Sequence, residues 1–197
     1  MSYRIESHEL PLTALRRIAR EQIGKAIEEL DAPELGQEKT IHQVRKRCKK
    51  LRALMRLYRP ADKQTYRTEN RAFRDASRLL GTLRDYDALS ETAEKLKGDE
   101  APAEVAQAVD EIQRVLMLRR NQAANGEHPA PERLDQFRDA MEEGLRRVEQ
   151  WQIGVDGGRT LAAGTRRSYR RARKAMAQAY EDPSAENFHE WRKRVKY

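Results

Sequence analysis

The chain contains a single cysteine and no long run of apolar residues. One cysteine excludes an internal disulfide and a metal site built from several cysteines. The absence of an apolar run of about 18 residues excludes a transmembrane helix. Residues 1–6 lack the apolar segment of a secretory signal peptide. We therefore expect a soluble, cytoplasmic protein.

Aromatic and aliphatic residues are also scarce. Aromatics make up 6% of the chain, and Leu, Ile, Val and Phe together number 35 of 197 residues. So low a share is typical of disordered chains when the net charge is high. The formal net charge is only +8, however, and the apolar residues recur at helical spacing. The composition therefore fits one folded domain.

Helix-breaking residues divide the chain into segments with helical periodicity. Pro60 must interrupt a helix, because proline has no N–H and clashes with the preceding turn. No segment shows the apolar/polar alternation that is typical of a half-buried strand. We predict an all-α fold with helices at about 9–31, 39–59, 62–80, 83–97, 102–124, 131–151, 161–181 and 184–197.

Residues 41–49 are repeated as residues 188–196. The two segments share His, Arg, Lys, Arg and Lys at equivalent positions, and paired arginines precede each copy. This repeat predicts that a helical unit is duplicated, with the first copy at about 1–125 and the second at about 130–197. The second copy stops soon after His189, so we expect an incomplete unit from a longer protein. Its apolar residues Phe188, Trp191 and Val195 would be exposed, or covered in a homodimer or swapped assembly.

The positive charge is concentrated in three segments. Residues 40–60 hold eight Lys/Arg and no acid, residues 159–174 hold seven and no acid, and residues 189–197 hold four and one Glu. The remainder of the chain is net acidic. Such concentration of cations attracts polyanions.

The helix at 39–59 places its cations opposite its apolar side chains. Only Arg47 falls at the apolar edge when residues are placed 100° apart. A solvated face normally mixes Glu with Lys, because like charges one turn apart repel. This face has no acid over about 21 Å, which indicates an anionic ligand. Its candidate binding residues are His42, Arg45, Lys46, Lys49, Lys50, Arg52 and Arg56.

Three further helices supply candidate cations. We expect Arg166, Arg170 and Arg173 to face the cations of helix 39–59. The matching helix of the first copy is weaker, because glutamates dilute its arginines. The additional candidates are Arg167 and Lys174 on helix 161–181, His189, Arg192, Lys193 and Lys196 on the last helix, and Arg16, Arg17 and Arg20 on the first.

Four segments together resemble the CHAD domain, a helical family named for a conserved histidine. They are residues 42–54, 78–89, 166–173 and 189–197, and the resemblance covers the whole chain except a missing C-terminal part. It implies two antiparallel helical-bundle units around a basic groove. Basic side chains of both units would bind inorganic polyphosphate in this groove, sometimes near polyphosphate granules. The resemblance also adds Arg78 and Arg84 to the candidate residues. Phosphate or sulfate ions could occupy the same site. We expect no cofactor.

Other residues leave several chemistries open. His42 and His189 could be capping residues or metal ligands, but we favour a neutral imidazole that donates to a phosphate oxygen. Asp85 and Asp87 could be catalytic, but we expect them to orient neighbouring cations. Cys48 falls on the apolar face and should be buried and inert.

Two other functions compete with polyphosphate binding. RNA or DNA could bind the same cations, although few aromatics are interleaved with them for base stacking. A phosphate-transferring enzyme is disfavoured, because no metal site is visible. We therefore expect a binding protein and no catalytic residues.

Overall fold

The computed structural model describes residues 3–98, 101–152 and 157–196, and every regular element within them is a helix. The predicted all-α fold is confirmed. The last long helix begins at Gly157 rather than at residue 161. The elements are α1 (Pro11–Leu30), the 3-10 turn η1 (Pro33–Leu35), α2 (Gly36–Tyr58), α3 (Lys63–Leu79), α4 (Gly81–Lys97), α5 (Ala103–Ala124), α6 (Ala130–Glu149), α7 (Gly157–Glu181) and α8 (Ala185–Lys196).

Local sequence explains where α2 ends and α3 begins. The last residue of α2 is Tyr58, two residues before Pro60. Asp62 then caps α3: its carboxylate accepts hydrogen bonds from the backbone N–H groups of Gln64 at 2.8 Å and Thr65 at 2.9 Å. Such a cap satisfies N–H groups that have no partner within the helix.

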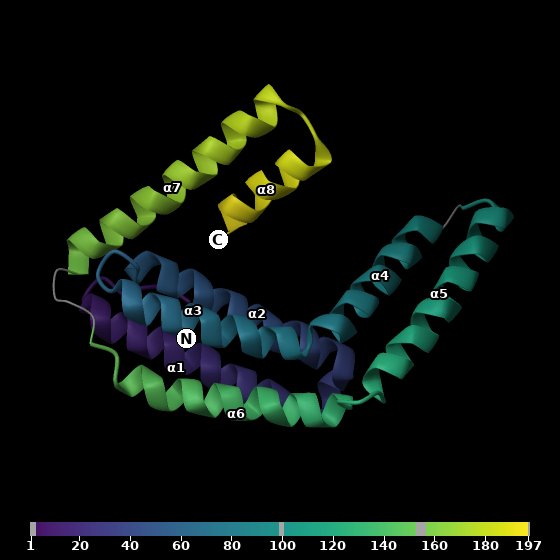
Figure 1. Ribbon diagram of the computed structural model, residues 1–197, viewed down its shortest axis with the longest axis horizontal. Coiled ribbons are helices and arrows are strands. Elements are labelled where there is room, and N and C mark those ends of the chain that lie inside the picture. Colours follow the sequence, from purple (N-terminus) through teal and green to yellow (C-terminus); the bar gives the residue numbers. More distant parts are fainter. Residues whose placement is uncertain (1–2, 99–100, 153–156, 197) are drawn as a thin grey trace.

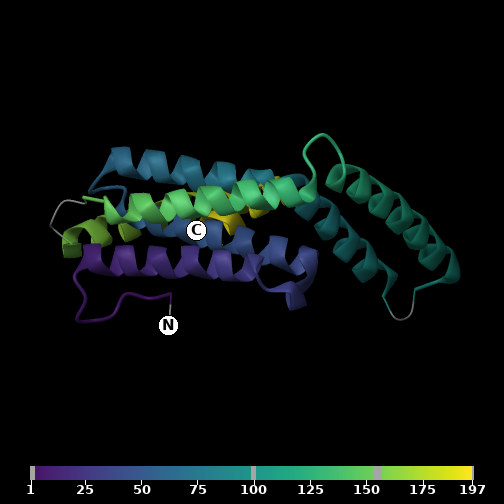
Figure 2. The same cartoon turned by 90° about the horizontal axis from the view of Figure 1, so that it is seen from below.

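The helices α1, α2, α3 and α6 form a bundle around the hydrophobic core (Figure 2). Leu15 of α1, Val44 of α2, Phe73 of α3 and Phe137 of α6 are all fully buried in it. Cys48 is buried in the same core, as expected, and burial raises the pKa of its thiol to about 12. The thiol therefore stays protonated at neutral pH.

Helix α6 belongs to this bundle, although its sequence position suggested the start of the second repeat. It packs against α1 and α3. Its Arg147 donates two hydrogen bonds, of 2.9 and 3.2 Å, to the buried carboxylate of Glu69 on α3. A buried charge requires such a partner. The division of the chain into two repeats stays a prediction.

Two helical hairpins project from the bundle, α4–α5 at one end and α7–α8 above α2 (Figure 1). The α7–α8 hairpin meets the bundle where Gly164 of α7 lies against the backbone of Leu57. A Cβ atom at residue 164 would fall 2.1 Å from the carbonyl oxygen of Leu57. Glycine therefore allows the two helix backbones to touch.

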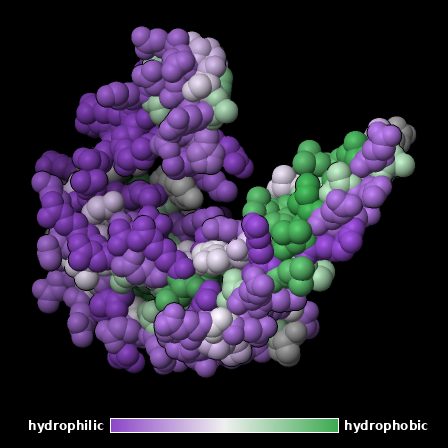
Figure 3. Space-filling model, turned by 45° about the vertical axis from the view of Figure 1, so that its right-hand side comes forward, coloured by the Kyte–Doolittle hydropathy of each residue, from purple (hydrophilic) through white to green (hydrophobic). Residues whose placement is uncertain are grey.

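Both hairpins expose apolar side chains. The space-filling view shows a hydrophobic strip on α4–α5 facing the hollow between the hairpins (Figure 3). Leu96 of α4 is 71% exposed. On α8, Phe188 is 44% and Val195 65% exposed, as expected, whereas Trp191 is half-buried against Tyr180. None of the helices in the described ranges is long and apolar enough to cross a bilayer.

Candidate polyanion-binding site

A cavity of about 560 Å³ lies on the cationic face of α2. Residues of α2, α4 and α8, together with Tyr3, form its wall. Seven of the predicted site residues line it: His42, Arg45, Lys46, Lys49, Lys50, Arg84 and Lys196. The structure therefore brings the end of the third basic segment, residues 189–197, against the first, residues 40–60.

The cations of this cavity repel one another. Burial lowers the pKa of Lys49, and the positive charges of Arg45, Lys196 and Arg84 lower it further. Arg45 is also partly buried, which lowers its pKa, and Arg84 adds repulsion. Bringing these like charges together costs electrostatic free energy. An anion bound among them would offset that repulsion.

One carboxylate lines the cavity, and it acts on Arg45. The negative charge of Asp85 opposes the lowering of the Arg45 pKa. The guanidinium of Arg45 also donates to the backbone oxygen of Ser77 on α3. Arg84 is held by Glu91 through two hydrogen bonds of 2.7 and 3.1 Å. These contacts orient the two guanidinium groups at the edge of the cavity.

Asp87 does not orient a cation of the cavity. It is buried, and one carboxylate oxygen accepts a hydrogen bond of 2.5 Å from Arg120 of α5. Arg120 also donates to Gln37, near the start of α2, at 3.3 Å. The pair therefore joins α4 to α5 and both to α2. Asp87 therefore orients a basic side chain, as expected, but that side chain is Arg120, which does not line the cavity.

His42 lies at the wall of the cavity with a lowered pKa. Burial is the main cause, and the positive charge of Arg84 adds to it. The imidazole is therefore neutral at pH 7 and can donate one hydrogen bond. Such a donor suits a phosphate oxygen. Within the described residues, no group of three or more His, Cys, Asp or Glu side chains is placed to hold a metal ion.

The α2 face continues beyond the cavity toward α3 and α7. Arg52 donates to the side-chain oxygen of Asn70 on α3 at 3.1 Å. Arg56, one turn further, lies close enough to Arg171 of α7 for its charge to lower the pKa of that residue. Arg47, predicted at the apolar edge, pairs instead with Glu29 of α1.

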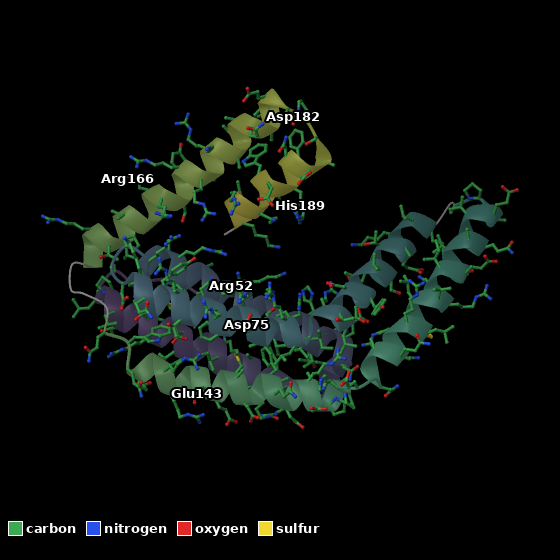
Figure 4. All side chains as sticks on the ribbon, in the orientation of Figure 1. Arg52, Asp75, Glu143, Arg166, Asp182 and His189 are labelled. Carbon is green, nitrogen blue, oxygen red and sulfur yellow. The ribbon has the colours of Figure 1, made fainter. Side chains whose placement is uncertain are left out.

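The cations of α7 do not face α2 as predicted. Gly164 marks the side of α7 that contacts α2, and residues 166, 170 and 173 point roughly the opposite way at 100° per residue. Figure 4 shows Arg166 on the side of α7 away from the bundle. Arg166, Arg170 and Arg173 are therefore turned away from the α2 face.

Arg171 is the α7 residue that lies near the cationic face of α2, where Arg166, Arg170 and Arg173 were expected. Burial lowers its pKa, and so do the charges of Arg194, Arg56 and Arg167. The predicted residue Lys174 shares a smaller cavity of about 340 Å³ with Arg171 and Arg194. Neither Arg171 nor Arg194 was among the predicted site residues. Gly164 is the signal that could have pointed to Arg171, because it identifies the face of α7 that docks on α2.

On α8, four predicted residues lie on the side away from α7. Trp191 packs on Tyr180 of α7, and residues 189, 192, 193 and 196 lie about 100° to 200° from it around the helix. Figure 4 places His189 on that side, and Lys196 reaches the cavity. Lys193 pairs with Glu190. The face that carries His189, Arg192, Lys193 and Lys196 is therefore turned toward the hollow.

The remaining predicted residues lie outside the cavity wall. Arg78 lies on α3, 3.7 Å from Asp75. The α1 residues are held in other contacts: Arg16 donates to the backbone oxygen of Trp151, Arg17 pairs with Glu9 at 2.6 Å and Glu21 at 2.9 Å, and Arg20 pairs with Glu149 at 2.5 Å. The structure does not bring Arg16, Arg17 and Arg20 to the cavity.

Tyr3 lines the cavity, although no motif or charge pattern in the sequence pointed to it. Its hydroxyl donates to the backbone oxygen of Lys50 at 2.7 Å, and the ammonium of Lys50 lies 5.2 Å from the ring centroid. Burial raises its pKa to about 12. Lys50 thus occupies one side of the ring, so a base that stacks there would compete with this cation.

Comparison with known proteins gave one result. No curated protein and no solved structure matches the chain. The family model of the CHAD domain, in contrast, matches residues 17–197 and so spans the helices that form the cavity. The chain therefore belongs to the CHAD-domain family, which is associated with polyphosphate binding.

Proposed function

We propose that this protein binds inorganic polyphosphate in the cavity on α2 and does not break it down. The observation that carries the proposal is the meeting of Lys49 and Lys196, which belong to the two copies of the repeated segment, in one cavity. Among the described residues of its wall, Asp85 is the single carboxylate. A linear polyanion is the ligand that relieves repulsion along a row of cations. Arginine binds two oxygens in a fixed fork, and lysine adds a mobile point charge.

The cavity suits phosphate chains better than nucleic acid. Among the wall residues in the described ranges, Tyr3 alone is aromatic, and the ammonium of Lys50 lies 5.2 Å from its ring centroid. Proteins that bind single strands combine cations with exposed aromatic rings on which the bases stack. The arrangement here supplies the cations without the stacking surface.

A competition titration tests this function. Labelled long-chain polyphosphate is displaced by unlabelled polyphosphate or by single-stranded RNA, compared at equal concentrations of negative charge. We expect polyphosphate to compete at a clearly lower concentration than RNA, and both affinities to fall steeply with salt. Equal or stronger competition by RNA would refute the proposal. Release of phosphate in the presence of Mg²⁺ would refute the absence of turnover.

A further inference from the structure

The outer face of α3 carries a second row of cations. At 100° per residue, residues 67, 71, 74 and 78 fall within about 60° of each other and extend over about 16 Å. The opposite face of α3 enters the core through Glu69, Phe73 and Ala76. The α3 row consists of Arg67, Arg71, Arg74 and Arg78.

The α3 row has more positive charge than its neighbours neutralise. Asp75 pairs with Arg74 at 2.8 Å and lies 3.7 Å from Arg78. In the part of the chain that the structure describes, no carboxylate forms an ion pair with Arg67 or Arg71. The nearby Glu69 points inward to Arg147. Repulsion within the row therefore persists until an anion binds.

A cavity of about 540 Å³ lies beside the row, between α3 and α6. Besides Arg67 and Arg71, its wall includes the hydroxyl-bearing Thr68 and the amide-bearing Gln64. These groups can donate hydrogen bonds to oxygen atoms. Asp75 also lines this cavity, so one carboxylate opposes an anion there.

The α3 row lies next to the cationic face of α2. Arg52 of α2 bonds to Asn70 at 3.1 Å, and Asn70 is within one helical turn of Arg67 and Arg74. Figure 4 shows Arg52 at the edge that faces the hollow and Asp75 on the neighbouring helix α3. An extended polyanion that leaves the α2 cavity past Arg52 would reach the α3 row directly.

We infer that the α3 row is a second binding surface, which holds the part of a long phosphate chain that extends beyond the α2 cavity. The inference rests on the proposed function and adds a dependence on chain length. A chain anchored in the cavity presents its remaining phosphates to α3 at a high effective concentration. A chain too short to leave the cavity gains nothing from α3.

The test compares two double variants with two ligands. Arg67→Gln/Arg71→Gln removes the two unpaired cations of the row, and Arg114→Gln/Arg119→Gln removes the same charge from the exposed surface of α5. We expect the α3 variant to bind long-chain polyphosphate roughly tenfold more weakly than the α5 variant. Both variants should bind tripolyphosphate as the wild-type protein does.

The alternative outcomes are distinct. Equal affinities of the α3 and α5 variants for long chains would overturn the inference and leave the cavity proposal intact. Equal loss of both ligands in the α3 variant would also overturn it, because α3 would then be part of one undivided site. Failure of the wild-type protein to bind any polyphosphate would remove the proposed function and this inference together.

Asp75→Asn provides a change in the opposite direction. It removes the carboxylate that pairs with Arg74 and Arg78, so long chains should bind several-fold more tightly and tripolyphosphate should be unaffected. Asp139→Asn, at an exposed position of α6, is the matched control. No gain over that control would contradict a role for the α3 row.

Discussion

Replacing Lys46 and Lys49 together by glutamate should weaken the binding of long-chain polyphosphate on the order of 100-fold. Both ammonium groups line the α2 cavity, and a cation near an anionic surface contributes about 1 kcal/mol. Charge reversal removes about 2 kcal/mol of attraction and adds a repulsion that salt partly screens. The total change is therefore about 3 kcal/mol, and each 1.4 kcal/mol is about a tenfold change in affinity. Titration at two salt concentrations measures it.

The control for this variant reverses two arginines of α5, and the ion pairs of that helix decide which two are suitable. Arg120 is unsuitable, because its loss would leave the buried carboxylate of Asp87 without a partner. Arg114 and Arg119 are exposed, so reversing both gives the same net charge with little effect on the fold. A loss of affinity in this control equal to that in the Lys46/Lys49 variant would mean that only net charge matters.

Gly164→Val should displace the α7–α8 hairpin from α2. The new side chain would overlap the carbonyl of Leu57, and overpacking of this kind costs about 1–3 kcal/mol. Lys196 would then leave the α2 cavity, so polyphosphate affinity should fall roughly tenfold. Hydrogen exchange should show α7 and α8 losing protection while α1, α2, α3 and α6 keep theirs.

Gly158→Val is the matched control for this prediction. Gly158 lies on the same helix, and a Cβ atom there would meet no atom within 4 Å. Both variants introduce the same side chain and the same change in helix propensity. Equal hydrogen exchange in the two variants, or unchanged affinity in Gly164→Val, would contradict the role of the hairpin in the site.

The helices themselves could be predicted from the sequence with little error. The chain leaves α2 and begins α3 near Pro60 and Asp62, because proline cannot continue a helix and aspartate caps the start of one. The cationic face of α2 was also predictable, because apolar side chains occupy the other face and enter the core. Arg47 was correctly separated from that face and pairs with Glu29.

The direction of the α7 cations could not be predicted from charge spacing alone. Helical periodicity tells which residues share a face, but not which face docks against another element. On α7 the docked face is fixed by the backbone contact at Gly164, so Arg171 points toward Arg56 while Arg166 points away. The approach of Lys196 to Lys49 depends on this tertiary contact too.

The most direct test of the central claim is lysine footprinting with and without polyphosphate. The protein is treated with an amine-reactive reagent, and modification at each lysine is measured by mass spectrometry. We predict that polyphosphate protects Lys46, Lys49 and Lys196, which line the α2 cavity, and leaves Lys95 and Lys97 at the far end of α4 unchanged. Uniform protection of all lysines, or protection that omits Lys49 and Lys196, would contradict a binding site formed jointly by α2 and α8.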